Sequence, residues 1–528
     1  MNDKAKVTVN IDGRDVQVDA GIPVIEACKQ AGRDIPHFCY HQDLSIAGNC
    51  RMCAVEIEKA RGLPISCATP VADGMIVRTD TERVKAHRKA VMEFLLINHP
   101  IDCPICDQAG ECALQIYYMQ HDLQPSRLDV EKVHYEKRLP IGPEVMLDRE
   151  RCVECTRCIR FCEEVPGTSE LCMTNRGDRS IIATFPDTPL ENDYSVCTAD
   201  VCPVGALTQR DFRFKVRPWF LKEAESICTA CARGCNVYTD YGWHPVVRDY
   251  EGKAYRTRPR RNPHVNKSWM CDFGRGEYRK VNEDRVLEAR LGGETATVEK
   301  TLEAALRVLR EAGQPLLIGS LDSSLEELHV LQRLAQETFR GAPLMAVPHR
   351  PDGKEDDILL RADKHPNRKG AEWMGVLGDR GRLTDLLKGR RAVLIHQADL
   401  LLMDEDGALE AALREVPHVV MIAANHHRTT ALATHLLPGR SLIEKDGHFV
   451  NFEGRLQRFF RGRYMKSPGA ARDDVALLAK LSGDVLPATA RAAFQSLASR
   501  LSVLEGLDWT SAGREGLLPG AVSEGVEV

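Results

Sequence analysis

The last 257 residues of this 528-residue chain contain no cysteine, although the first 271 residues contain 19. Thiolate ligands for a metal can therefore come only from the first half of the chain. A chain of this length also exceeds the size of a single hydrophobic core. The cysteine-rich and cysteine-free parts are thus predicted to be separate structures.

Long apolar runs are also missing, since no stretch approaches the roughly 18 to 20 residues that a membrane-spanning helix needs. The first ten residues are polar and lack the apolar segment of a secretory signal. The net charge is only −5, with both signs mixed along the chain, which argues against nucleic acid or an anionic membrane as the main partner. These absences predict a soluble protein in a reducing compartment, where cysteines bind metal rather than form disulfides.

What the first half does contain is four groups of residues with the spacing of iron–sulfur ligands. The groups are Cys39, Cys50, Cys53 and Cys67; His99, Cys103, Cys106 and Cys112; Cys152, Cys155, Cys158 and Cys202; and Cys228, Cys231, Cys235 and Cys271. Clusters bound in this way transfer single electrons. The pattern predicts an electron carrier that binds iron only through these residues and has no catalytic residue of its own.

The first group suits a [2Fe–2S] cluster, because the long loop before Cys50 contains Gly48 and can aim backbone N–H groups at the cluster. The alternative is a structural zinc site. Zinc sites usually pair two short C-x₂₋₄-C knuckles, and this group has only one, from Cys50 to Cys53.

The other three groups have loops short enough to enclose [4Fe–4S] clusters. In the second, His99 replaces one thiolate, and a neutral imidazole should raise the reduction potential because it removes a negative charge. The third combines a C-x₂-C-x₂-C run with a remote Cys202-Pro203, as bacterial ferredoxins do. The four cysteines outside the groups are predicted to be small buried apolar residues; they are Cys28, Cys162, Cys172 and Cys197. The basic residues 256–261, inside the fourth group, are expected in a solvated loop.

Periodicity predicts the elements around these groups. Residues 6–19 alternate around Asp12-Gly13 as in a β-hairpin with a primed turn, and a short helix follows from Pro23 to Gly32. Residues 82–98 form an amphipathic helix that delivers His99 at its end. Beyond Cys271 the pattern changes to helix (297–312), strand (315–319), helix (325–335) and two more strands (392–396 and 419–423), which predicts a parallel sheet with flanking helices.

The predicted fold class is therefore multidomain, α+β followed by α/β. The expected domains are a β-grasp [2Fe–2S] ferredoxin domain (1–82), a His/Cys-ligated 4Fe–4S helical segment (83–125), a bacterial-ferredoxin-like 4Fe–4S domain (140–215), a further 4Fe–4S domain (221–277) and an α/β domain (278–528).

The motifs that carry these groups resemble the G subunit of bacterial NADH-quinone oxidoreductase, respiratory complex I, which corresponds to the 75 kDa iron–sulfur subunit of mitochondria. The resemblance rests on H-x₃-C-P-I-C-D-Q-A-G-E-C (99–112), R-C-V-E-C-T-R-C-I-R-F-C (151–162) and V-C-P-V-G-A-L-T (201–208). A thinner match at 436–438, 444–447 and 451–457 resembles the molybdopterin-oxidoreductase-like domain of the same subunit. The family resemblance implies that 221–277 is a 4Fe–4S domain of the kind that begins molybdenum and tungsten enzymes, and that 278–528 is a shortened molybdopterin-oxidoreductase-like α/β domain.

The resemblance implies a subunit that relays electrons from the NADH/FMN-binding subunit towards quinone, coupled in the whole complex to proton translocation. It implies one [2Fe–2S] and three [4Fe–4S] clusters and a path from the first group to the third and then the second. The region after Cys271 is shorter than in many members of the family, and this departure predicts that no molybdopterin binds. The fourth group would lie off this path. The implied partners are the NADH/FMN-binding subunit, the ferredoxin-like subunit and the quinone-site subunits, on the cytoplasmic face of the inner membrane, which the chain contacts only indirectly.

Four alternatives share parts of this pattern. A formate dehydrogenase-like molybdoenzyme needs a Cys, selenocysteine or Ser ligand to molybdenum and a longer domain, and an iron-only hydrogenase needs cysteines after Cys271. The diaphorase-type iron–sulfur subunit of an NAD-reducing hydrogenase typically ends after the ferredoxin-like part. A scaffold stapled by zinc is the alternative without redox chemistry.

Overall fold

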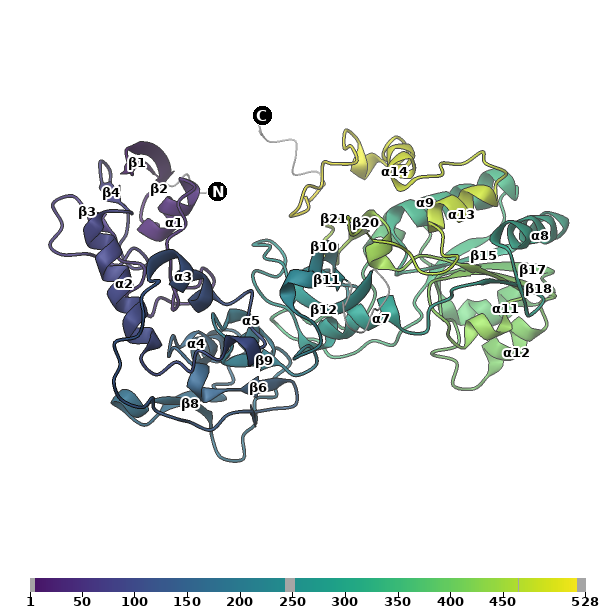
Figure 1. The fold of residues 1–528 in the computed structure, drawn as a ribbon. Coiled ribbons are helices and arrows are strands. Elements are labelled where there is room, and N and C mark those ends of the chain that lie inside the picture. The colour runs from purple at the N-terminus through teal and green to yellow at the C-terminus, as the bar shows by residue number, and fades with distance from the viewer. Residues whose placement is uncertain (1–4, 243–251, 464, 520–528) are drawn as a thin grey trace. The chain divides into compact units, whose positions relative to one another are not determined.

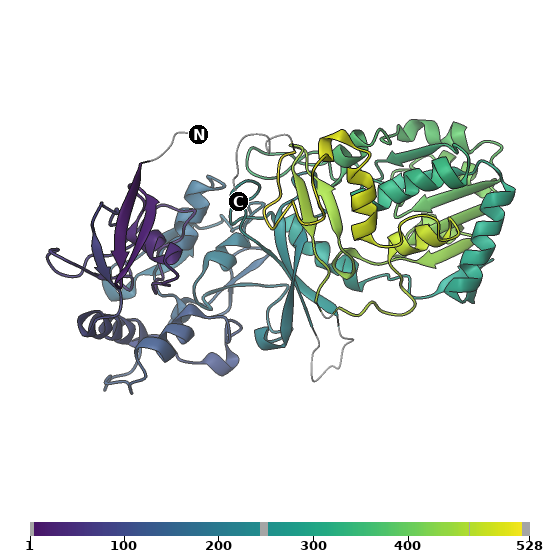
Figure 2. The same ribbon diagram turned by 90° about the horizontal axis from the view of Figure 1, so that it is seen from above.

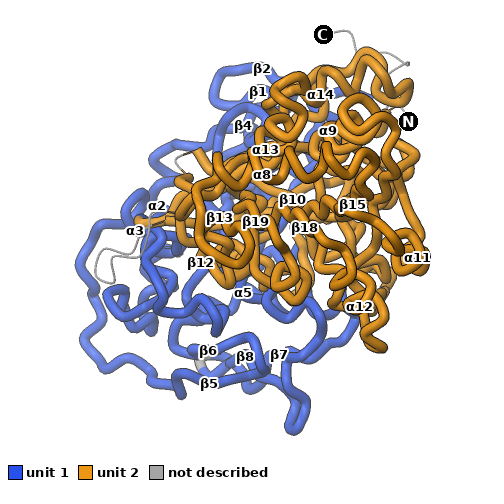
Figure 3. Tube along the Cα trace, turned by 90° about the vertical axis from the view of Figure 1, so that its right-hand side faces the viewer, with its two compact units in different colours: residues 1–219 blue, residues 220–528 orange. Residues whose placement is uncertain are grey.

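The computed structural model describes residues 5–242, 252–463 and 465–519. The chain divides into two compact units, Met1–Trp219 and Phe220–Val528 (Figure 3). Residues 1–4, 243–251, 464 and 520–528 of the expected domains lie outside the described part. Within the described ranges, no helix combines the length and apolar character needed to cross a bilayer.

The first unit begins with the predicted hairpin (Figure 2). Its turn places Asp12 and Gly13 at φ angles of 50° and 86°, as a primed turn requires. The helix follows, and two later strands complete a mixed sheet of order β2-β1-β4-β3, in which β4 runs parallel to β1. The elements are β1 (Lys6–Ile11), β2 (Arg14–Asp19), α1 (Val24–Gln30), β3 (Glu56–Ile57) and β4 (Ile76–Arg78). Both the hairpin and the helix are confirmed.

The helix before His99 is also confirmed, as α2 (Glu82–Leu96), and the Thr81 side chain caps it by accepting from the backbone of Val84. The apolar period of residues 82–98 includes Phe94, but this residue is 72% exposed and does not face the interior, so that part of the predicted apolar face is wrong. The rest of the unit is built from short elements. They are α3 (Ala113–His121), β5 (Leu139–Pro140), β6 (Val145–Leu147), α4 (Arg157–Glu164), β7 (Leu171–Thr174), β8 (Ile181–Thr184), α5 (Cys197–Val201) and β9 (Leu207–Gln209).

The second unit opens with an antiparallel meander of three strands, β10 (Leu221–Ile227), β11 (Asn236–Gly242) and β12 (Lys253–Pro259). The basic residues expected in a solvated loop belong partly to β12. Arg256 and Arg258 both donate to the carboxylate of Asp240, which is 1% exposed. A cross-strand carboxylate thus turns a basic run into a buried ion-pair network, which the sequence pattern alone did not reveal.

The larger part of the second unit surrounds a seven-stranded sheet of order β14-β13-β19-β18-β17-β15-β16. Its strands are β13 (Ala289–Leu291), β14 (Glu294–Ala296), β15 (Leu316–Ser320), β16 (Leu344–Val347), β17 (Ala392–His396), β18 (His418–Ala423) and β19 (His435–Pro438). The predicted parallel arrangement is confirmed for the strands from β15 to β19. The sheet as a whole is mixed, since β13 pairs antiparallel with β19 and β14.

Helices cover both faces of this sheet (Figure 1). Leu317 and Leu394 pack into one core with α8 and α9, whereas Ile318 and Val393 pack into another with α11 and α12. This alternation follows from the two-residue period of a strand. The helices are α8 (Val298–Glu311), α9 (Leu325–Arg333), α10 (Arg368–Trp373), α11 (Leu383–Leu387), α12 (Ala408–Arg414), α13 (Asp474–Lys480) and α14 (Ala490–Ala498), and a hairpin joins β20 (Gly447–Val450) to β21 (Leu456–Phe459).

Candidate iron–sulfur sites

The four thiols of the first group lie close together. A hydrogen bond from Cys50 lowers the pKa of Cys39 to about 5, and one from Cys67 lowers the pKa of Cys53 to about 7. The pKa of Cys67 is raised, first by its contact with Cys53 and then by burial and the charges of Cys39 and Cys50. Gly48 makes the loop possible, because its φ of +64° is left-handed. The group therefore has the donors and the compactness that a [2Fe–2S] cluster needs.

The second group places an imidazole beside three thiols. The Nδ1 atom of His99 is buried and has no hydrogen-bond partner among the described residues. Burial lowers the pKa of His99 to about 4, so the ring is neutral near pH 7, the form that binds a metal. His99, Cys103 and Cys112 line one groove of about 690 Å³, and Cys106 interacts electrostatically with Cys112. A buried nitrogen without a partner beside thiols fits an iron ligand.

Lys132 supports the backbone that carries His99. Its ammonium donates to the carbonyl oxygens of Leu96, Ile97 and His99, at 2.8, 2.9 and 2.8 Å. These carbonyls belong to the end of α2 and the residues just after it, where backbone acceptors have no partner within the helix. Lys132 thus fixes the backbone that follows α2 and, with it, the position of the His99 imidazole.

The third group surrounds a single cavity, which is lined by Cys152, Cys155, Cys158 and Cys202 together with apolar side chains. Cys158 lies on α4, and Cys202 directly follows α5. The backbone N–H of Glu154 points at the Cys152 sulfur at 3.4 Å. Burial raises the pKa of Cys155 to about 11. Because thiols buried in this way need a cation to become thiolates, the site fits a metal cluster that supplies that charge.

The ligand loops of the first unit adjoin one another. Ala113, next to Cys112, donates its backbone N–H to the carbonyl of Pro203, next to Cys202, at 3.0 Å. Gly205 brings the third loop against the second group, since a Cβ there would lie 2.3 Å from the Cys106 sulfur. The second and third groups are therefore in direct backbone contact.

The first and third loops are joined by an arginine. The Nη2 atom of Arg160, on α4, donates to the carbonyl oxygen of Cys39 at 2.6 Å and to that of Cys155 at 3.3 Å. Asn49 adds a second contact by donating to the carbonyl of Glu154 at 3.1 Å. The third group thus touches both of the others.

The fourth group lies in the second unit, and all four of its cysteines are buried. Cys228 follows β10 and donates its N–H to the carbonyl of Cys235 at 2.8 Å. The sulfur of Cys271 accepts from the N–H of Gly274 at 3.4 Å. A Cβ on Gly274 would lie 2.9 Å from the Cys228 sulfur and 3.6 Å from that of Cys271, so only glycine leaves both sulfurs room to face the same point.

The cysteines outside the groups are buried, with one exception. Cys28, Cys162 and Cys197 are 0% exposed, and burial raises the pKa of Cys28 and of Cys162 to about 12. Cys172 is only partly buried, on the edge hairpin of β7 and β8. The prediction of a fully buried apolar residue is therefore wrong for Cys172.

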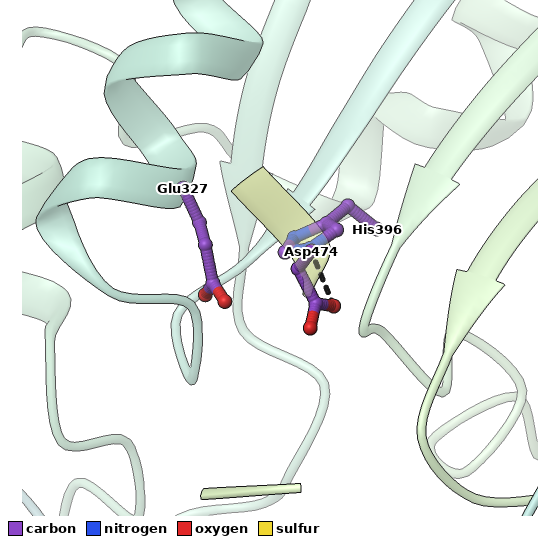
Figure 4. A group of neighbouring side chains, drawn as sticks. All are labelled: Glu327, His396 and Asp474. Atoms are coloured by element: carbon purple, nitrogen blue, oxygen red, sulfur yellow. Dashed lines mark hydrogen bonds and ion pairs between the residues drawn. The ribbon is translucent and has the colours of Figure 1, made fainter. Parts of the chain in front are cut away.

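A buried polar cluster in the second unit, formed by Glu327, His396 and Asp474, resembles a metal site (Figure 4). Ligand atoms of Glu327, His396 and Asp474 lie within 4.8 Å of one another. The ammonium of Lys445 lies 2.5 Å from the Glu327 carboxylate and 3.6 Å from that of Asp474. Burial alone would raise the pKa of Asp474, but Lys445 and His396 hold it below its ordinary value. The ammonium of Lys445 therefore takes the place that a metal cation would occupy.

A cavity of about 380 Å³ lies beside Cys228, at the ends of β15 and β17. Its basic side chains are matched by carboxylates: Arg350 contacts Asp322, and Arg440 contacts Asp473 at 3.1 Å. Such a lining carries little surplus positive charge for a ligand with several phosphates.

Sequence reasoning proposed the ligand groups but missed the residues that hold their loops. Arg160 lies inside the third motif, where its position next to ligand cysteines was a usable signal. Lys132 follows His99 by 33 residues in an irregular segment, and its spacing carries no signal.

Four family models match the chain in order. They are the 2Fe-2S iron-sulfur cluster binding domain (4–82), the NADH-ubiquinone oxidoreductase-G iron-sulfur binding region (88–127), the ferredoxin-like domain of NADH-quinone oxidoreductase subunit 3 (142–208), and molybdopterin oxidoreductase (383–484). Three iron–sulfur domains followed by an α/β domain define a multidomain iron–sulfur protein.

Curated relatives narrow this class. The 78 kDa subunit of mitochondrial NADH-ubiquinone oxidoreductase from Candida albicans is 30% identical over an alignment of 603 positions. The alignment covers 90% of this chain and 82% of the relative. The G subunit of NADH-quinone oxidoreductase from Rickettsia conorii is 38% identical over 338 residues, 63% of this chain and 49% of the relative. The chain belongs to the family of NADH-quinone oxidoreductase G subunits. It spans about half the length of the Rickettsia relatives that it matches.

Among solved structures, a chain of an NAD⁺-reducing [NiFe]-hydrogenase is 29% identical, with a TM-score of 0.37, over 40% of this chain and 91% of that chain.

Proposed function

We propose that this chain is an electron-transfer subunit of NADH-quinone oxidoreductase. It carries one [2Fe–2S] cluster on the first group and one [4Fe–4S] cluster on each of the other three, within the five domains predicted from the sequence. It receives electrons from the NADH/FMN-binding subunit and passes them to the ferredoxin-like subunit on the way to quinone. The whole complex couples this flow to proton translocation, with this subunit on the cytoplasmic face of the inner membrane.

The observation that carries the proposal is that the third group adjoins both of the other groups in the first unit. Arg160 joins the first loop to the third, and the bond between Ala113 and Pro203 joins the third to the second. Electron carriers need their centres close together and fixed, and a third group next to both others suits the path that the family resemblance implies.

Bound iron–sulfur clusters supply reversible one-electron oxidation and reduction. The chain's own residues hold the ligands in place, exclude water from them and tune their charge. Burial keeps water away from the thiols, and the imidazole of His99 is a neutral ligand. The N–H groups of Glu154 and Gly274 point at the sulfurs of Cys152 and Cys271.

Low-temperature EPR with iron counting on the full chain tests the proposal. We expect one binuclear and three cubane signals and about 14 iron atoms per chain if loading is complete. Zinc in the four groups, or reconstituted protein without iron–sulfur absorption, would instead establish a structural scaffold.

The α/β domain of the second unit has a structural or docking role in this proposal and binds no molybdopterin. The paired charges of its cavity support this, because the pterin cofactor is a phosphate-bearing anion. Metal analysis of the purified complex is expected to find no molybdenum, and stoichiometric molybdenum or tungsten would contradict the assignment.

A further inference from the structure

Arg160 occupies an unusual position between two ligand groups. It lies on α4 two residues after Cys158, and it is 8% exposed. One nitrogen, Nη2, donates to the carbonyl oxygens of both Cys39 and Cys155, at 2.6 and 3.3 Å. Its Nη1 atom donates to the carbonyl of Ser45. A single guanidinium nitrogen thus connects a ligand of the first group to a ligand of the third.

The charge of Arg160 is not balanced by a carboxylate among the described residues. Its Nε atom donates to the Thr156 hydroxyl at 3.3 Å, and its other acceptors are backbone carbonyls. Within the part of the chain that the structure describes, Arg160 forms no ion pair. A buried cation is costly unless an anion balances it. The anions within reach are those that the two ligand groups would supply when they hold clusters, since Arg160 contacts the backbone of Cys39 and of Cys155.

We propose that Arg160 is the positioning residue that couples the first and third iron–sulfur sites, by bridging the carbonyls of Cys39 and Cys155 and balancing the charge of both groups. The inference rests on the proposed function, since it requires that both groups hold clusters. The step it serves moves one electron from the first site, which is oxidised, to the third site, which is reduced. No bond breaks and no proton moves.

Other contacts hold the same two loops and allow the role of Arg160 to be separated from docking in general. Arg157, one turn earlier on α4, donates to the carbonyls of Tyr40 and, at 3.2 Å, Val201. Glu164, at the end of α4, accepts from the backbone N–H of Ser45 at 2.8 Å. Glu164 therefore fastens the first loop to α4 without touching a ligand cysteine, and Glu164→Gln is the matched control.

The test uses the assembled complex carrying Arg160→Lys, Arg160→Gln or Glu164→Gln. Rapid freeze-quench EPR after mixing with NADH measures the transfer of electrons from the binuclear site to the third site, and a redox titration measures both potentials. We expect both Arg160 variants to slow this transfer by about tenfold, the low end of what loss of an outer-shell partner of a metal ligand costs. Arg160→Gln should also lower both potentials, because a positive charge next to each site is lost, whereas Arg160→Lys should largely preserve them. Glu164→Gln should leave the transfer rate and the potentials unchanged.

Three results would overturn the inference. The first is an unchanged transfer rate in Arg160 variants that retain both signals. The second is equal slowing by Glu164→Gln, which would make general docking the cause. The third is loss of iron from the first or third site in both Arg160 variants, because the residue would then hold the sites rather than couple them. Absence of the two signals from the unmodified complex would instead refute the proposed function.

Discussion

The guanidinium of Arg151 donates two hydrogen bonds, of 3.0 and 2.6 Å, to the carboxylate of Asp102. Each residue directly precedes a ligand cysteine, Cys152 in the third group and Cys103 in the second. The Arg151 side chain is only 4% exposed, so the pair lies in a setting of low dielectric constant. This bidentate pair locks the entrances of two ligand loops together.

Replacing Asp102 with asparagine should weaken this lock. Arg151 would keep only Asp148, at 3.3 Å, as a carboxylate partner. We expect the free energy of unfolding to fall by about 3 kcal/mol, the low end of the cost of breaking a buried ion pair. Anaerobic denaturant titration of the iron-loaded protein measures it. The control is Glu136→Gln, which removes a pair at 3.4 Å whose carboxylate is 67% exposed and should cost under about 1 kcal/mol. Equal effects of the two variants would contradict a buried lock.

Replacing His99 with cysteine should keep a cluster and lower its reduction potential. A thiolate adds one negative charge to the ligand set and so disfavours the reduced form. An EPR-monitored redox titration measures the potential of the second site. An unchanged potential would count against ligation by His99.

Replacing Cys53 with alanine should abolish NADH-driven quinone reduction in the assembled complex, because electrons could not enter the chain at its first group. NADH:ferricyanide activity, which belongs to the flavin subunit, should remain. The matched control is Cys28→Ala, since Cys28 is equally buried but lies outside the ligand groups. If Cys53→Ala removed both activities alike, an assembly defect would explain the loss.

Mild acid should destabilise the second unit through His329, which is 1% exposed on α9. Burial, and then the nearby Arg333 and Arg500, lower the pKa of His329 to about 4. The unfolded chain, with a pKa of about 6.5, binds the proton more tightly, so this contribution to stability is present above that value and is lost as the pH falls towards 4.

We therefore expect the free energy of unfolding to drop by about 2 kcal/mol from pH 7 to pH 5 through this residue. His329→Gln should remove that part of the pH dependence in denaturant titrations. His264→Gln, at an imidazole that is 54% exposed, should not change it. Identical slopes for His329→Gln and the unmodified protein would show that another group is responsible.

Local pattern was enough to predict much of this protein. The hairpin around Asp12-Gly13 followed from a turn that needs positive φ at both residues, and α2 followed from the apolar period of residues 82–98. The parallel strands of the second unit followed from short apolar runs between amphipathic helices. The four candidate ligand groups were predicted from the spacing of their cysteines and of His99.

Partners far apart in the chain were beyond such patterns. Phe94 continues the apolar period of α2 and is nevertheless exposed, and Arg256 of β12 is buried because Asp240 lies opposite it on β11. The short strand β13 pairs antiparallel with β14 and with β19. The direction of this pairing depends on the path of the chain between β13 and β19, which no local pattern reveals.

The sequence by itself therefore yielded the candidate ligand groups and determined most of the elements that carry them, since each depends on residues near one another in the chain. Only the tertiary structure decided which groups adjoin and what holds them. Arg160 meets Cys39 across 121 residues, and Lys132 meets His99 across 33. Such contacts depend on how separate loops pack, and the identity of neither residue reveals its distant partner.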